Sequence, residues 1–207
     1  MTRKPEAKDV LRSVCVYCGS SDGADPAFGE AAAEFGRLLA ESGLQLVYGG
    51  GSVGLMGRVA RSVMQAGGTV VGIIPRFLHE REVMLREVTD LVVTEDMHER
   101  KRLMFDKADA FVALPGGVGT LEEVVEMMTW SQLGQHDKPI VLANLKDFWA
   151  PLHNLLGHMT EAGFISHNRE VVYDVVPAIE DVIPLLRERA AALHAAREPK
   201  PATLSRL

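Results

Sequence analysis

Short apolar runs alternate with longer amphipathic segments along most of this 207-residue chain. The apolar runs predict buried strands at residues 14–17, 44–48, 69–74, 110–114 and 139–143. The segments between them carry apolar residues at helical spacing and predict helices at residues 26–42, 55–66, 98–108 and 121–133. Repeated strand–helix–strand units with continuously apolar strands are typical of a parallel sheet covered on both faces. We therefore expect an α/β fold, a doubly wound (Rossmann-like) parallel sheet in a single domain.

The two ends of the chain depart from this pattern. Residues 1–11 alternate charges, and residues 198–207 contain two prolines and no periodicity. We expect a flexible N-terminus over 1–11, a folded domain over 12–197 that includes further helices near 148–161 and 178–197, and a flexible C-terminal tail over 198–207.

The charge balance limits the partners of the chain. A net charge of −6 argues against nucleic acid and against an anionic membrane surface, because both normally bind a basic face. The N-terminal segment has no apolar core of a signal peptide, and no stretch approaches the roughly 20 apolar residues of a membrane span. We expect a cytoplasmic protein that binds neither nucleic acid nor membrane.

Glycine-rich turns follow three of the predicted strands. They are Gly19-Ser20-Ser21, Gly49 to Gly54, and Pro115 to Glu123, which holds the motif P-G-G-x-G-T-x-x-E. Ligands of parallel sheets bind at the carboxyl ends of the strands, so these turns belong to one candidate site. Glycines let backbone amides approach an anion closely, and a helix beginning near Thr120 directs its positive dipole end at the same point. This arrangement predicts a phosphate cradle with Glu122 and Glu123 beside it.

Two nucleotide-binding motifs are incomplete. Gly49, Gly51 and Gly54 fit G-x-G-x-x-G, but the dinucleotide fingerprint also needs an acidic residue about 20 positions later, where this chain has Ile74-Pro75-Arg76. No glycine turn continues into G-K-[ST], so a nucleoside-triphosphate P-loop is not supported. A tight turn with close helix packing is the alternative interpretation of Gly49 to Gly54.

Cysteine and histidine patterns favour neither metal nor redox chemistry. Cys15 and Cys18 form C-x-x-C within an apolar run, where burial as core residues is the expected outcome. No second cysteine pair and no H-E-x-x-H motif accompanies them. We expect no metal and no cofactor.

A cationic run opens one of the predicted helices. Arg100, Lys101 and Arg102 are consecutive, and a solvated charged face is the usual explanation for such a run. However, the dipole disfavours cations at the start of a helix, so a nearby anion would explain them. The planar fork of Arg100 suits such a partner, which makes Arg100 a candidate site residue.

Three segments together resemble the Lonely Guy family of cytokinin-activating phosphoribohydrolases, whose members were long mislabelled as lysine decarboxylases. These segments are Tyr48 to Gly57, Met97 to Lys101 and Pro115 to Glu123, and the similarity extends from Cys18 to about Val171. The resemblance implies hydrolysis of the N-glycosidic bond of nucleoside 5'-monophosphates, including AMP, to free base and ribose 5-phosphate. Lysine decarboxylation is not supported, because the sequence shows no pyridoxal-phosphate lysine context.

The resemblance also implies roles for individual residues. By their match to the family motifs, Glu123 is the catalytic carboxylate and Arg100 its catalytic partner, which orients the substrate or assists the leaving base. A carboxylate near the anomeric carbon can stabilise the positive charge that develops on the sugar or activate water. Lys101 and Glu122 are expected to border the site. Further substrate-binding positions are Ser20, Glu87, Gly116, Gly117, Val118, Gly119, Thr120, Leu121 and Thr129.

Two other functions stay open at this point. One is a nucleosidase for purine or pyrimidine monophosphates in salvage; the other is a carrier that binds a nucleotide or the molybdenum cofactor without turnover. Retention of both Glu123 and Arg100 favours an enzyme, since a carrier needs no carboxylate beside its anion. The resemblance further implies a homodimer or larger homo-oligomer. Met127, Met128, Trp130 and Leu133 could serve either the core or that interface, and the core is the preferred interpretation.

Overall fold

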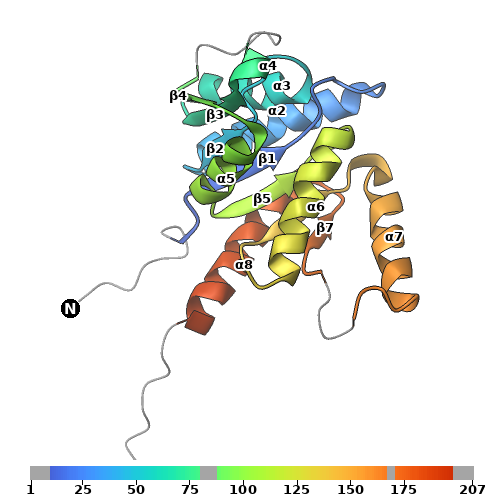
Figure 1. The fold of residues 1–207 in the computed structure, drawn as a ribbon. Coiled ribbons are helices and arrows are strands. Elements are labelled where there is room, and N and C mark those ends of the chain that lie inside the picture. The colour runs from blue at the N-terminus through green and yellow to red at the C-terminus, as the bar shows by residue number, and fades with distance from the viewer. Residues whose placement is uncertain (1–9, 80–87, 167–170, 198–207) are drawn as a thin grey trace, which may run out of the picture.

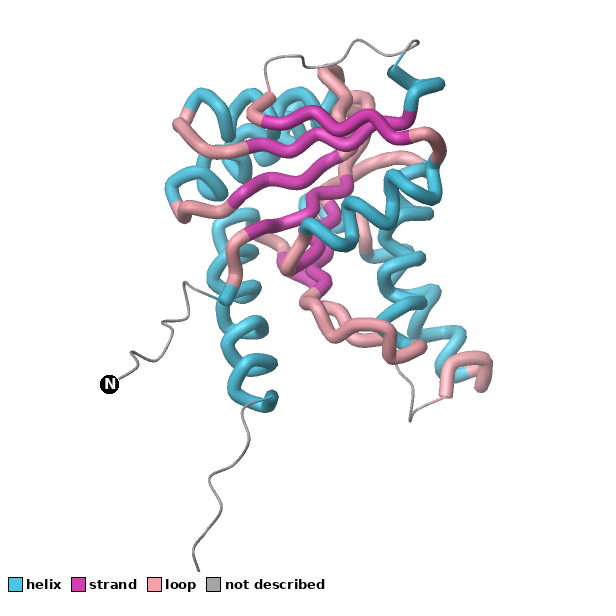
Figure 2. The backbone as a smooth tube through the Cα atoms, turned by 60° about the vertical axis from the view of Figure 1, so that its left-hand side comes forward, coloured by secondary structure: helices cyan, strands magenta, loops and turns pink. Residues whose placement is uncertain are grey.

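The computed structural model describes residues 10–79, 88–166 and 171–197. Its centre is one sheet of seven parallel strands in the order β4-β3-β2-β1-β5-β6-β7. The strands are β1 (Ser13–Tyr17), β2 (Gln45–Tyr48), β3 (Val70–Pro75), β4 (Asp90–Thr94), β5 (Ala110–Ala113), β6 (Ile140–Ala143) and β7 (Asp174–Val176). The sheet runs as a single twisted layer through the molecule (Figure 2). The predicted doubly wound parallel sheet is confirmed.

Helices cover both faces of the sheet. They are α2 (Pro26–Glu41), α3 (Gly54–Gln65), α4 (Arg76–His79), α5 (Met97–Lys107), α6 (Val118–Gln132), α7 (Ala150–Glu161) and α8 (Val182–Arg197), with 3-10 turns at Leu145–Asp147 and Ile179–Asp181. One core cluster joins the sheet to α2, α3 and α8, and a second joins its other face to α5 and α6. In Figure 1, α5 and α6 lie on the near side of the strands.

Local sequence explains the helix boundaries. The side chain of Asp25 accepts a hydrogen bond from the amide of Ala27 at 2.9 Å, and Pro26 occupies the first helical turn of α2, where its missing N–H costs nothing. Asp96 caps α5 in the same way through the amide of Glu99 at 2.8 Å. On β1, alternate side chains enter opposite faces: Val14 and Val16 join the α2 side, while Cys15 and Tyr17 join the α5 and α6 side.

The sequence prediction missed the two edge strands. β4 is only partly buried along its length, and β7 has three residues. An edge strand pairs on one side only and is often short and polar, so neither strand carries the continuous apolar run that marked the five central ones.

Several observed boundaries differ from the predicted ones. Helix α6 begins at Val118 rather than near Thr120, which places Gly119 and Thr120 inside its first turn. Leu11, assigned to the flexible N-terminus, is 1% exposed and belongs to the core; the remainder of that segment and the tail 198–207 lie outside the described residues, apart from Val10. Met127 and Met128 are core residues as expected, whereas Leu133 is 64% exposed. Within the described ranges, no helix combines the length and apolar character needed to span a membrane.

Candidate active site

The sheet order places β1 beside β5, where the direction of strand succession reverses. In open α/β sheets, ligands bind at the carboxyl ends of the strands at this reversal. Backbone hydrogen bonds join the turns there. The amide of Gly19 donates to the carbonyl of Pro115 at 3.0 Å, and the amides of Leu55 and Met56 donate to the carbonyls of Ser21 and Gly19 at 3.4 and 3.2 Å. The three glycine turns therefore form one surface.

The N-terminus of α6 opens onto this surface. Gly117 is its N-cap and provides no side-chain cap, whereas α2 and α5 are capped by aspartates. The first-turn amides of a helix have no carbonyl partner within it, so they are available to an anion. Space is available too: a Cβ added to Gly117 or Gly119 would meet no atom within 4 Å, and Val118 is 84% exposed.

Close packing behind the cradle requires glycine at two other positions. A Cβ on Gly116 would lie 2.2 Å from the hydroxyl oxygen of Thr120 and 2.9 Å from the amide nitrogen of Gly19. Gly54 has φ of +60°, and a Cβ there would lie 2.3 Å from the carbonyl carbon of Ser20. The glycine turn after β2 thus packs against the turn after β1, which supports the tight-turn interpretation of that segment.

Arg100 is a buried cation between β3 and α6. The residue is 7% exposed; its Nε donates to the carbonyl of Ile73 at 3.1 Å, and its Nη1 donates to Oε1 of Glu123 at 2.5 Å. A Cβ on Gly49 would lie 2.5 Å from Nη2 of Arg100, so this glycine makes room for the guanidinium. The solvated-face interpretation of the cationic run is therefore wrong for Arg100.

Glu123 is the buried anion of the pair, with a side chain 12% exposed. Burial raises the pKa of its carboxyl above the ordinary value, and the guanidinium of Arg100 limits that rise. A carboxyl with a raised pKa can exchange a proton closer to neutral pH than an exposed glutamate can. The geometry thus provides an acid–base group next to an anion cradle.

Lys101 and Glu122 lie next to this pair. The Nζ of Lys101 donates to Oε1 of Glu122 at 2.7 Å and to Oε1 of Glu126 at 2.9 Å. Burial alone would lower the pKa of Lys101, but its hydrogen bonds to the two carboxylates raise it. Glu122, one position around the helix from Glu123, pairs with Lys101 and has a side chain 51% exposed.

The remaining predicted substrate-binding positions differ in their surroundings. Ser20 is exposed in the turn after β1, and Leu121, 38% exposed, lies on the first turns of α6. The hydroxyl of Thr129 donates to the carbonyl of Val125 at 2.8 Å, within its own helix. Glu87 lies outside the described residues.

The cysteines are free and buried, as predicted. Burial holds the pKa of both thiols far above the ordinary range, which makes them poor nucleophiles. Cys15 and Tyr17 lie on the face of β1 that packs against α5 and α6, and the nearby charge of Glu123 adds to the rise in the pKa of both groups. Across the described ranges, no group of three potential metal ligands occurs.

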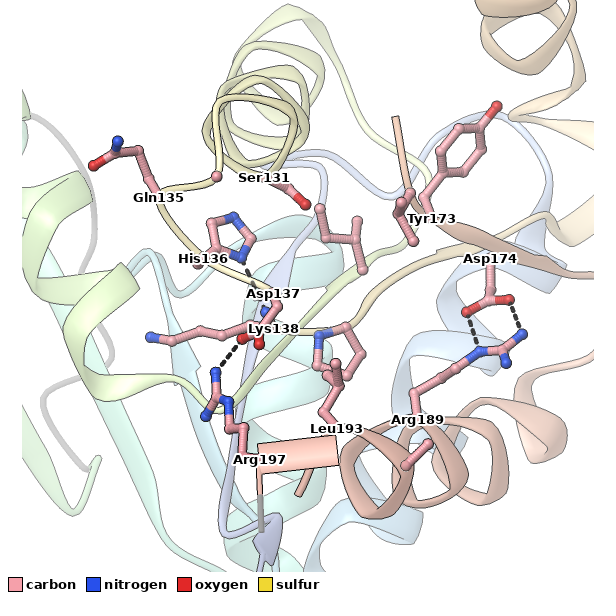
Figure 3. Close-up of a pocket in the computed structure, with 15 residues that line it drawn as sticks. Ser131, Gln135, His136, Asp137, Lys138, Tyr173, Asp174, Arg189, Leu193 and Arg197 are labelled. Carbon is pink, nitrogen blue, oxygen red and sulfur yellow. Dashed lines mark hydrogen bonds and ion pairs between the residues drawn. The ribbon is translucent and has the colours of Figure 1, made fainter. Parts of the chain in front are cut away.

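A further cavity lies at the opposite edge of the sheet. It measures 730 Å³ and is lined by the start of β6, by Asp174 at the start of β7 and by α8 (Figure 3). Its arginines are paired with its aspartates: Arg189 with Asp174 at 2.6 and 2.9 Å, and Arg197 with Asp137. The cavity is large enough for a small molecule, but it lacks the cradle and the buried ion pair of the other edge.

Sequence reasoning missed two partners at the site. The carbonyl of Ile73 holds Arg100, and Glu126 holds Lys101. The first contact joins residues 27 positions apart and has no local signal. The contact of Glu126 had a local signal in the sequence, since Glu126 follows Glu122 at the i, i+4 spacing that puts two side chains on one helix face.

Comparisons with known proteins agree with this geometry. A family model described as "Possible lysine decarboxylase" matches residues 56–186. A probable cytokinin riboside 5'-monophosphate phosphoribohydrolase of Oryza sativa subsp. japonica is 44% identical over 191 residues, covering 92% of this chain and 84% of the relative. The cytokinin riboside 5'-monophosphate phosphoribohydrolase of Rhodococcoides fascians is 42% identical over 199 residues, covering 96% of each.

Among solved structures, the molybdenum cofactor carrier protein of Chlamydomonas reinhardtii superposes with a TM-score of 0.66. The two sequences are 20% identical, and the match covers 87% of this chain and 99% of the carrier. At this level of identity the likeness describes the fold alone.

Proposed function

The chain belongs to the family of cytokinin riboside 5'-monophosphate phosphoribohydrolases, the Lonely Guy family, and we therefore propose that it hydrolyses the N-glycosidic bond of nucleoside 5'-monophosphates. The products are the free base and ribose 5-phosphate, and cytokinin riboside monophosphates and AMP are the proposed substrates. The observation that carries this proposal is the buried Arg100–Glu123 pair beside the open N-terminus of α6. An anion site alone would not need such a pair.

The proposed substrate site begins with the phosphate. The amides of Gly117, Val118, Gly119 and Thr120 bind it, helped by the dipole of α6. Gly116 and Ser20 shape the floor and one wall, and Leu121 borders the opening. We retain Glu87 and Thr129 as proposed positions from the family motif, without a contact to support either.

The chemistry falls to Glu123 and Arg100. The bond between the anomeric carbon and the base nitrogen breaks as positive charge grows on the ribose, and the carboxylate of Glu123 stabilises that charge or takes a proton from water. The oxygen of water forms the new bond to the anomeric carbon, and the leaving base gains one proton. Arg100 holds the carboxylate in place and orients the substrate through donors that Glu123 and Ile73 leave free.

A direct test uses the purified protein with AMP or isopentenyladenosine monophosphate as substrate, and chromatography to measure the released base. We expect base release from both nucleotides, and much less from adenosine, which lacks the phosphate. Glu123→Ala and Arg100→Ala should each lower release by about 10³-fold or more, while at least one of them still binds AMP. A protein that binds AMP and releases no base from any nucleotide would be a carrier, and the enzymatic proposal would fail.

We also propose that the active form is a homodimer or a larger homo-oligomer. Support comes from apolar side chains left exposed beside the cradle: Val118 at 84%, Leu155 at 48%, Leu121 at 38%, Val125 at 37% and Phe148 at 36%. Helix α7 has no buried residue, which is unusual for an amphipathic helix on a globular domain. Light scattering coupled to gel filtration tests this, and a monomer at micromolar concentration would contradict it. The free thiols Cys15 and Cys18 are compatible with the cytoplasmic location that we propose.

A further inference from the structure

Helices α5 and α6 meet along a line of side chains that we name the α5–α6 seam. It consists of Lys101 and Phe105 on α5 and of Glu122, Glu126 and Trp130 on α6. The members from each helix are four residues apart, so they share one helix face. Lys101 contacts both carboxylates, and the rings of Phe105 and Trp130 meet edge to face with centroids 5.2 Å apart.

The ion pairs of the seam are shielded to different extents. Lys101 has a side chain 13% exposed, Glu126 one 23% exposed and Glu122 one 51% exposed. Oε2 of Glu126 is buried and accepts no hydrogen bond, so the hydrogen bond of its Oε1 to Lys101 holds this carboxylate. The Lys101–Glu126 contact is therefore the well-shielded one, and ion pairs of this kind depend strongly on both partners.

On both helices, residues of the α5–α6 seam are close in sequence to the proposed catalytic pair. Lys101 follows Arg100 on α5, and Glu122 and Glu126 flank Glu123 on α6. The ammonium of Lys101 already has two of its three donors directed at carboxylates, which leaves it poorly suited to be a main substrate ligand. Its position suits another task, because any slide of α5 along α6 would move Arg100 relative to Glu123.

We infer that Glu126, acting through Lys101, is a positioning residue that sets α5 against α6 and so holds the guanidinium of Arg100 at the carboxylate of Glu123. The inference rests on the proposed function of that pair. Neither Glu126 nor Lys101 needs to touch the reacting atoms for this role. A displacement of about 1 Å at a reacting group can cost on the order of 100-fold in rate, so loss of the seam contact should lower kcat.

The experiment measures base release from AMP by the full chain carrying Lys101→Met, Glu126→Gln or both. We expect kcat to fall about 100-fold in Lys101→Met and about tenfold in Glu126→Gln, with KM within about threefold because the cradle amides of α6 are unchanged. The matched controls are Arg102→Met and Asp106→Asn, which remove the same charges from exposed positions on α5 and should keep kcat within about twofold.

The double variant tests whether Glu126 acts through Lys101. If it does, adding Glu126→Gln to Lys101→Met lowers kcat no further, whereas independent roles would multiply the two losses. Multiplied losses would overturn the inference.

A pH profile separates positioning from general destabilisation. Glu123 is surrounded by Arg100, Lys101, Cys15, Tyr17, Cys18 and Glu122. Because Lys101 lowers the pKa of Glu123, Lys101→Met should move the acidic limb of the kcat profile to higher pH, and Arg102→Met should leave it in place.

The outcomes distinguish a failure of the proposed function from a failure of the positioning role. No base release by the unaltered protein would overturn the proposed function, and this inference with it. Base release by Lys101→Met at the rate of Arg102→Met would overturn the inference alone. If thermal unfolding shows that Lys101→Met does not fold, Glu126→Gln decides, and an unchanged kcat in that variant would contradict the positioning role.

Discussion

The two edges of the sheet carry arginine–carboxylate pairs in opposite settings. At the carboxyl edge, the side chains of Arg100 and Glu123 are 8% and 12% exposed, and Gly49 makes room for the guanidinium. At the amino edge, the side chains of Arg197 and Asp137 are 68% and 46% exposed and line the cavity of about 730 Å³ (Figure 3). Volume alone would select the amino edge as the site. Burial of charge selects the carboxyl edge, because burying an ion pair is costly and charged residues are rarely buried without a structural or functional role.

The largest expected effect comes from breaking the buried pair. Glu123→Ala and Arg100→Ala should each lower base release by about 10³-fold or more, within the range of a lost acid–base group. Each variant leaves the charge of the other partner buried without its counter-ion, so the free energy of unfolding should also fall, by about 3–5 kcal/mol. Chromatographic assay and urea unfolding measure the two effects. Normal activity in either variant would remove the basis for favouring this edge.

The next effect concerns the room left for Arg100. Gly49→Ala places a Cβ 2.5 Å from Nη2 of Arg100 and should displace the guanidinium, with a loss of activity of about 100-fold and of about 1–3 kcal/mol in stability. Gly157→Ala on α7 is the matched control, since its Cβ would meet nothing within 4 Å. Equal behaviour of the two variants would show that close packing at Gly49 has no catalytic importance.

A smaller effect separates the cradle from the packing behind it. Gly117→Ala and Gly119→Ala fit the structure without a clash, but their methyl groups would occupy the space that we assign to phosphate. We expect KM for AMP to rise about tenfold in each, while Gly119→Ala, inside α6, gains up to about 1 kcal/mol in stability. Steady-state kinetics and thermal unfolding measure these changes. An unchanged KM in both would place the phosphate elsewhere.

The pH dependence of activity tests the effect of burial on Glu123. Glu123 must be ionised to stabilise the charged sugar, and burial raises its pKa above the ordinary 4.5. Activity should therefore decline as the pH falls through that raised pKa, with the midpoint of the acidic limb above 4.5. The measurement is kcat for AMP between pH 4 and 8 in a buffer series of constant ionic strength. A midpoint at or below the ordinary value would mean that the carboxylate is solvated during catalysis.

The smallest effect is expected at the amino edge. Arg197→Ala removes an exposed ion pair and should change the free energy of unfolding by at most about 1 kcal/mol, with base release unaltered. Comparison with Arg100→Ala tests the contrast directly, because both variants remove one arginine from an ion pair. A large loss of activity in Arg197→Ala would mean that the cavity in Figure 3 contributes to function.

The sequence alone determined the parallel sheet and its five central strands, because apolar runs and helical spacing are local or periodic signals. It also marked Arg100 and Glu123 as candidate residues, through their match to the motifs of the family. The tertiary structure decided what no local signal could carry. It showed the edge strands β4 and β7, the burial of Arg100 against the carbonyl of Ile73, and the contact of Lys101 with Glu126 across two helices. An edge strand lacks an apolar run because only one of its sides is paired, and an ion pair between residues 25 positions apart exists only after the chain has packed.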